Sequence, residues 1–152
     1  MNWLISITAG RWQRYAIQQA KEVGLNVLAI DSNPNAEGFM DADISICIDI
    51  FNVEGIISKI TELGIKPAGV CCFTSEAGMQ TAALLREYYD LKGLRQDDTD
   101  KFIYKNYQRE IWDRSNVEGP RWFTASSSED VTDLINTIKL PAIIKPVDSA
   151  GS

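Results

Sequence analysis

The sequence predicts an α/β fold in which a parallel sheet carries helices on both faces. Short stretches that are apolar on both faces alternate with segments that have one apolar helical face, as in parallel sheets covered on both sides. The expected strands are residues 2–8, 26–31, 44–48 and 68–73, and the expected helices are residues 14–23, 53–63 and 76–89. We therefore place a first domain at residues 1–95.

The expected helices are recognised by apolar side chains three or four positions apart. These side chains are Ile17 and Ala20 in the first helix, Ile56 and Ile60 in the second, and Ala82 and Leu85 in the third. Glycines follow the first two helices, as is common just after a helix end. The turn-rich segment 32–39 (SNPNAEGF) separates the second strand from the third.

The pattern changes after residue 95, and we expect a second, incomplete domain at residues 96–152. A polar connection (91–100) leads into a helix (101–114), a strand beginning at 120–124, a helix (129–138) and a strand (141–147). The last five residues (DSAGS) form a small-residue loop. Nothing in the sequence would cover the final strand.

Composition excludes several classes of protein. Hydrophobic residues make up 45 % of the 152 residues and charged residues 24 %, which is typical of a globular protein. A net charge of −6 argues against a nucleic-acid partner. No apolar run approaches the roughly 20 residues of a membrane span, and no secretory signal is present. The absence of histidine removes Ser-His-Asp and Cys-His mechanisms and histidine metal sites.

The three cysteines indicate a reducing compartment, so we expect a cytoplasmic protein. Cys47, Cys71 and Cys72 lie in apolar stretches, and their odd number fits no disulfide framework. We interpret them as buried small hydrophobic residues.

The first turn resembles a dinucleotide-binding turn, which leaves a nicotinamide-dependent Rossmann enzyme as one alternative. Asp31 follows Gly10 by 21 positions, near the spacing of the ribose-binding acid. However, Trp12 and Gln13 stand where close pyrophosphate approach needs glycines. A tight turn with Asp31 capping the next loop explains the pattern equally well.

Polar residues also follow the fourth strand, at Thr74-Ser75-Glu76. Ligands bind beyond the carboxyl ends of strands in open parallel sheets. Ser75 is either an N-cap of the next helix, with Glu76 favoured by the helix dipole, or part of an anion-binding edge. Both functions are compatible.

A lysine inside an apolar stretch is the most informative feature of the second domain. Lys145 lies in PAIIKPV, where burial of an ammonium is costly without an anionic partner. The following DSAGS segment has small residues whose backbone N–H groups could approach phosphate oxygens. A triphosphate clamp is one interpretation, and an edge-strand lysine that reaches water is the other.

Taken in order, five segments resemble the start of an ATP-grasp enzyme, close to the carbamoyl-phosphate-synthase-like branch. They are TAGRWQ, AIDSNPNAEG, ADISICID, TSEAG and IIKPVDSAGS. The resemblance covers nearly the whole chain. It implies a Rossmann-like pre-ATP-grasp domain, followed by an α+β nucleotide-binding subdomain that is truncated in its glycine-rich loop.

The resemblance implies an ATP-dependent ligase that phosphorylates a carboxylate and passes the acyl phosphate to an amine or related nucleophile. ATP would be held by Lys105, Lys145, Ser149, Gly151 and Ser152. The carboxylate substrate would be bordered by Gly10, Arg11, Ser75 and Glu76. Lys101 competes with Lys105 as the first ATP lysine.

The same resemblance places the Mg²⁺ ligands outside this chain, so the chain alone should be inactive. A homodimer is an expected assembly. The alternative from another class is a non-catalytic α/β module that binds a small ligand or a protein.

We predict that the chain does not bind NAD(H) measurably, because Trp12 and Gln13 replace the glycines of the dinucleotide turn. Titration calorimetry should detect no saturable binding. Saturation in the micromolar range would refute both this prediction and the ATP-grasp resemblance.

Overall fold

The structure is a computed structural model, and it describes residues 2–135, 137–138 and 140–148. The chain divides into two compact units, of which the first ends at Thr99 and the second begins at Asp100. This division falls four residues beyond the expected domain boundary at position 95. Each unit is described by itself. Among the described residues, no helix is both long enough and apolar enough to span a bilayer.

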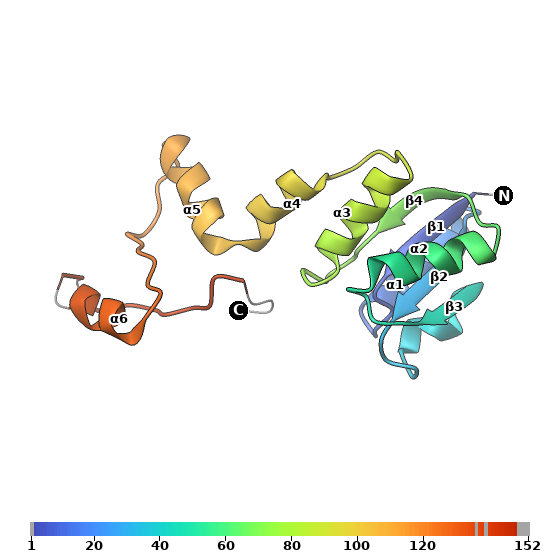
Figure 1. Ribbon diagram of the computed structural model, residues 1–152, viewed down its shortest axis with the longest axis horizontal. Coiled ribbons are helices and arrows are strands. Elements are labelled where there is room, and N and C mark those ends of the chain that lie inside the picture. Colours follow the sequence, from blue (N-terminus) through green and yellow to red (C-terminus); the bar gives the residue numbers. More distant parts are fainter. Residues whose placement is uncertain (1, 136, 139, 149–152) are drawn as a thin grey trace. The chain divides into compact units, whose positions relative to one another are not determined.

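The first unit contains a four-stranded parallel sheet, which confirms the predicted fold class. Its strands are β1 (Trp3–Ile7), β2 (Asn26–Asp31), β3 (Ile44–Cys47) and β4 (Pro67–Cys71), in the order β3-β2-β1-β4. Every neighbouring pair is parallel, and β1 lies between β2 and β4 (Figure 1). The carboxyl ends of all four strands therefore lie at one edge of the sheet.

Helices cover both faces of this sheet because its strands are apolar on both sides. The covering elements are α1 (Gln13–Glu22), the 3-10 helix η1 (Glu37–Met40), α2 (Val53–Glu62) and α3 (Met79–Tyr88). In β2, Val27 and Ala29 pack on one side with residues of α1, while Leu28 and Ile30 pack on the other with residues of α2 and α3. The period of two along the strand thus divides the core into two clusters.

The free edge of β4 is covered by a side chain. Arg86, on α3, donates from Nε (3.0 Å) and Nη2 (2.8 Å) to the carbonyl oxygen of Val70, and from Nη1 to that of Leu94 (3.3 Å). Burial lowers the pKa of this guanidinium. Pro67 begins the same strand, at an edge position where its missing N–H is tolerated. The two residues protect the edge from pairing with another strand.

The second unit departs from the predicted elements. Its helices are α5 (Lys105–Arg114) and α6 (Ser128–Ile135), while α4 (Gln96–Ile103) crosses the boundary between the units. The prediction of a single helix at 101–114 is wrong, because Tyr104 has an extended backbone (φ −83°, ψ 116°) between α4 and α5. The expected polar connection is therefore shorter, since α4 already begins at Gln96.

The strands expected at 120–124 and 141–147 are also wrong. None of these residues is in a strand, and Ile143 and Ile144 are 83 % and 76 % exposed. A strand needs a neighbour to bond its peptide groups, and within the described residues no strand pairs with either segment. A run of apolar, β-branched residues is therefore not enough to form a strand without such a neighbour.

The cysteines are less buried than expected. Cys47 is exposed, and Cys71 and Cys72 are half-buried. Cys47 lies on the edge strand β3, where alternate side chains face outward. Burial raises the pKa of the Cys72 thiol to about 11, so this thiol stays protonated and unreactive at neutral pH.

A close backbone approach joins η1 to the turn after β1. The N–H of Gly38 donates to the carbonyl oxygen of Ala9 over 2.6 Å. A Cβ atom at position 38 would lie 2.6 Å from that oxygen and 2.9 Å from Cδ1 of Ile17. Only glycine fits here without displacing the backbone.

We predict that Gly38→Ala lowers the free energy of unfolding by about 1–3 kcal/mol, the usual cost of overpacking. Gly69→Ala is the matched control, because a Cβ there would make only an ordinary 3.4 Å contact with Leu4. Urea unfolding of both variants measures the difference. Equal midpoints for the two variants would contradict this account of η1 packing.

Candidate functional site

The candidate site lies at the carboxyl edge of the sheet in the first unit. The segments that follow β1, β2 and β4 meet there, and ligands of open parallel sheets bind at such edges. We name them the first loop (residues 8–12), the second loop (32–36) and the fourth-strand loop (72–78).

The first loop is tied to the end of β2 through Asp31. The N–H of Ala9 donates to Oδ2 of Asp31 over 2.8 Å, and the N–H of Asn33 donates to Oδ1 over 2.9 Å. Both carboxylate oxygens therefore accept backbone hydrogen bonds. This confirms the structural interpretation of Asp31 as a residue that fixes the tight turn and the next loop.

The first loop is also tied to the fourth-strand loop, through Gln13. This side chain is buried (6 % exposed), and its Nε2 donates to the carbonyl oxygen of Phe73 (2.7 Å) and to Oγ1 of Thr74 (2.9 Å). The sequence interpretation treated Gln13 only as an obstacle to a dinucleotide. Its position one turn before Ile17, on the buried face of α1, was the signal that it points inward.

The predicted substrate residues fall into the two loops that Gln13 joins. Gly10 and Arg11 lie in the first loop, and Ser75 and Glu76 lie in the fourth-strand loop. Arg11 and Glu76 are exposed, and Ser75 is half-buried. The structure thus brings together two pairs of residues that are far apart in sequence.

The interpretation of Ser75 as a helix N-cap is wrong. Helix α3 begins at Met79, and its N-cap is Gly78. A Cβ atom at position 78 would lie 2.6 Å from Sγ of Cys72 and 2.9 Å from Cγ2 of Ile7. Ser75 and Glu76 therefore lie in the fourth-strand loop, ahead of the helix.

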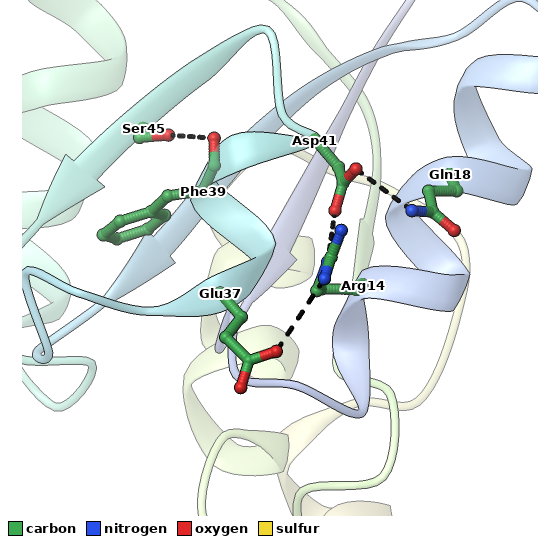
Figure 2. Close-up of polar contacts among 6 residues, drawn as sticks. All are labelled: Arg14, Gln18, Glu37, Phe39, Asp41 and Ser45. Carbon is green, nitrogen blue, oxygen red and sulfur yellow. Dashed lines mark hydrogen bonds and ion pairs between the residues drawn. The ribbon is translucent and has the colours of Figure 1, made fainter.

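A polar cluster holds η1 against α1, beside the first loop (Figure 2). Nε of Arg14 donates to Oδ2 of Asp41 over 2.6 Å, and Nη1 of Arg14 lies 3.8 Å from Oε2 of Glu37. Nε2 of Gln18 donates to Oδ1 of Asp41 over 3.0 Å. The hydrogen bonds from Arg14 and Gln18 lower the pKa of the Asp41 carboxyl. This cluster fixes the far side of the second loop.

The two predicted ATP lysines lie near one backbone contact of the second unit. Lys105 is the first residue of α5, and its N–H donates to the carbonyl oxygen of Val147 over 3.0 Å. Lys145 lies two positions before Val147 and is exposed, so its expected burial within a strand is wrong. Ser149, Gly151 and Ser152 lie outside the described residues.

Lys101, the competing lysine, lies in the last turn of α4. A cation there is favoured by the helix dipole, so the helix itself explains it. Lys105 begins a helix that has no acidic residue in its first turn, where a cation is disfavoured.

Metal ligands do not gather among the described residues. No group of three or more aspartate, glutamate, cysteine or histidine side chains there could hold an ion. No catalytic step is therefore assigned to a metal bound by these residues.

Comparison with known proteins gives structural matches alone. No model of a protein family matches the sequence, and no curated protein matches it. The structural matches are ATP-grasp ligases, so the fold resemblance read from the sequence is confirmed.

Three solved structures illustrate this likeness. A phosphoribosylglycinamide synthetase from Anaerococcus prevotii is 24 % identical, and the match covers 92 % of this chain and 35 % of that chain, with a TM-score of 0.70. An N5-carboxyaminoimidazole synthetase from Staphylococcus aureus complexed with ADP is 17 % identical. That match covers 98 % of this chain and 39 % of that chain, with a TM-score of 0.77. An L-amino acid ligase from Bacillus licheniformis is 18 % identical, and the match covers 98 % of this chain and 38 % of that chain, with a TM-score of 0.73.

The present chain therefore has the fold of the N-terminal regions of ATP-grasp ligases. It spans less than two fifths of the length of these three structures.

We predict that Asp41→Asn makes the first unit less stable at pH 7, by up to about 1 kcal/mol, because a partly exposed ion pair is lost. The pKa of Asp41 is lowered in the folded state. The ionised carboxylate therefore stabilises the fold fully above the unfolded pKa of about 3.9, and this stabilisation is lost as the pH falls further. Urea unfolding between pH 2.5 and 7 should show the variant and the wild type converging at low pH. The exposed Glu118→Gln variant is the control. Parallel curves for Asp41→Asn and wild type would count against the ion pair.

Proposed function

We propose that this chain is the front part of an ATP-dependent ligase that joins a carboxylate to an amine or a related nucleophile. The observation that carries the proposal is the likeness to ATP-grasp ligases over 92 % to 98 % of the chain in the three structures described above. The ADP bound in one of them supports nucleotide binding by the parent protein.

In this proposal, the γ-phosphoryl group of ATP passes to the carboxylate and ADP leaves. The nucleophile then attacks the acyl carbon of the acyl phosphate, and inorganic phosphate leaves. The protein acts by positioning the reactants and by stabilising charge on the phosphoryl oxygens. Mg²⁺ would neutralise phosphate charge, held by ligands outside this chain.

Lys105 and Lys145 are the residues that we propose for the ATP phosphates. The bond between the backbones of Lys105 and Val147 supports this pairing, because it joins the two segments that carry the lysines. The start of α5 adds a positive helix-dipole end to the same region. Ser149, Gly151 and Ser152 are proposed to continue the phosphate-binding loop.

The carboxyl edge of the sheet is the proposed substrate side. Arg11 is exposed there and has a guanidinium that could bind a carboxylate through two hydrogen bonds. Gly10, Ser75 and Glu76 border the same edge. Which carboxylate binds there depends on the parts of the ligase beyond this chain.

We further propose that these 152 residues alone do not catalyse the reaction, since they match under two fifths of each related ligase. The parent enzyme is proposed to be a cytoplasmic homodimer of the carbamoyl-phosphate-synthase-like branch. The nicotinamide alternative is disfavoured, because Trp12 and Gln13 stand where close pyrophosphate approach needs glycines.

We predict that Lys145→Ala in the complete ligase lowers kcat/KM for ATP by roughly ten- to a hundred-fold. The loss corresponds to a hydrogen bond to a charged group, worth about 1.5–3 kcal/mol. Lys105→Ala should act similarly, and steady-state ADP formation measures both.

Lys101→Ala is the control and should change kcat/KM for ATP far less, because α4 explains its position. If Lys145→Ala kept the wild-type value, the phosphate-binding role would be wrong. If Lys101→Ala were damaging and Lys105→Ala silent, the first ATP lysine would be Lys101.

A further inference from the structure

We infer that Gln13 is a positioning residue that couples the two loops of the proposed substrate edge. This inference rests on the proposed function for the identity of the edge, and on hydrogen-bond geometry for the coupling. Gln13 would not touch the substrate. It would set where Arg11 and Glu76 stand relative to each other.

Gln13 reaches across the sheet edge to a loop 60 positions away. Its Nε2 donates to the carbonyl oxygen of Phe73 over 2.7 Å and to Oγ1 of Thr74 over 2.9 Å. Both acceptors lie in the fourth-strand loop. Because the amide is buried, a lost partner would leave an unpaired polar group out of reach of water.

The amide suits this position because of its two N–H donors. Both donors are used, and the reverse orientation would set the amide oxygen against the carbonyl oxygen of Phe73. On its other side, Oε1 lies close to the first loop, since a Cβ atom at Gly10 would be 3.0 Å from it. The backbone N–H of Gln13 also donates to the carbonyl oxygen of Gly10 over 3.1 Å, so Gln13 is bonded to both loops, and the missing Cβ of Gly10 leaves room for its side chain.

The fourth-strand loop needs this support because its backbone is strained. Thr74 has a positive φ of 52°, a region that β-branched residues rarely adopt, and Thr8 at the end of β1 has a φ of 72°. Such conformations persist only where surrounding contacts hold them. The bond to Oγ1 holds Thr74 directly, so removing the donor should let this loop relax.

Two charged residues lie close in sequence to the hydrogen bond between Gln13 and Thr74. Arg11 lies two positions before Gln13, and Glu76 lies two positions after Thr74. Both side chains are exposed, and neither forms an ion pair with another residue of the described part of the chain. Gln13 therefore sets the spacing of the two charges that a substrate would meet, while the ATP-binding segments belong to the second unit.

The first test measures amide hydrogen exchange in the 152-residue chain, with Gln13→Leu as the variant. Amides of residues 73–78 should exchange roughly tenfold faster or more, while those of β1 and β2 stay protected. Gln19→Leu is the matched control, because the side chain of this exposed glutamine of α1 donates to Glu22 of the same helix and to neither loop. Unchanged exchange at 73–78 in folded Gln13→Leu would overturn the coupling.

Thr74→Val provides the second variant, should Gln13→Leu fail to fold. It removes one acceptor of Gln13 and keeps the branched shape of the side chain. It should accelerate exchange in the same loop by a smaller factor. An unchanged rate in Thr74→Val would also overturn the coupling.

In the complete ligase, a selective change in one KM would distinguish a positioning role from a purely structural one. With glycine as the carboxylate probe, Gln13→Leu should raise KM for glycine at least about tenfold, and KM for ATP should stay within about twofold. Equal changes in both constants would refute the positioning role. A wild type that forms no ADP with glycine would show that glycine is not its carboxylate substrate, and the exchange result would then decide the coupling by itself.

Discussion

The structure of the candidate site depends on the buried peptide groups of Ala9. This residue has no exposed surface, so an unpaired N–H or carbonyl group there would be costly. Its N–H is bonded by Asp31 at the end of β2, and its carbonyl accepts from Gly38 in η1. These two hydrogen bonds of Ala9 therefore hold β1, β2 and η1 together at one point, and they restrain the loops around this residue.

Gln13 extends the same arrangement to β4. With it, three strand ends are joined by hydrogen bonds, from the N–H of Ala9 to the Asp31 carboxylate and from the Gln13 amide to the segment after β4, and none of these bonds is an ion pair. Arg11 and Glu76 are consequently left exposed at the edge. The ion pair of Arg14 with Asp41 lies instead between α1 and the segment after η1, where it is structural. Charges that hold the fold and charges available to a ligand are thus separate.

The sheet could be predicted from sequence because its information is local. A stretch that is apolar on both faces defines β2 at the expected residues, and the parallel order then places Gly10, Asp31 and Thr74 at one edge. The second unit could not be predicted in the same way. Strands at 120–124 and 141–147 depend on a neighbour, and the break at Tyr104 lies in a segment without glycine or proline. Gln13 was missed for a related reason, since its partners lie about 60 positions away.

The second unit nevertheless joins two segments that are about 40 positions apart in sequence, at the start of α5. Lys105 is the first residue of α5, at the positive end of the helix dipole. Val147 brings the segment of Lys145 to the same helix end through one backbone bond. Because this contact joins backbone atoms, it does not depend on the charge of either lysine side chain. The phosphate-binding role that we propose for Lys105 and Lys145 can therefore be tested separately from the packing of the second unit.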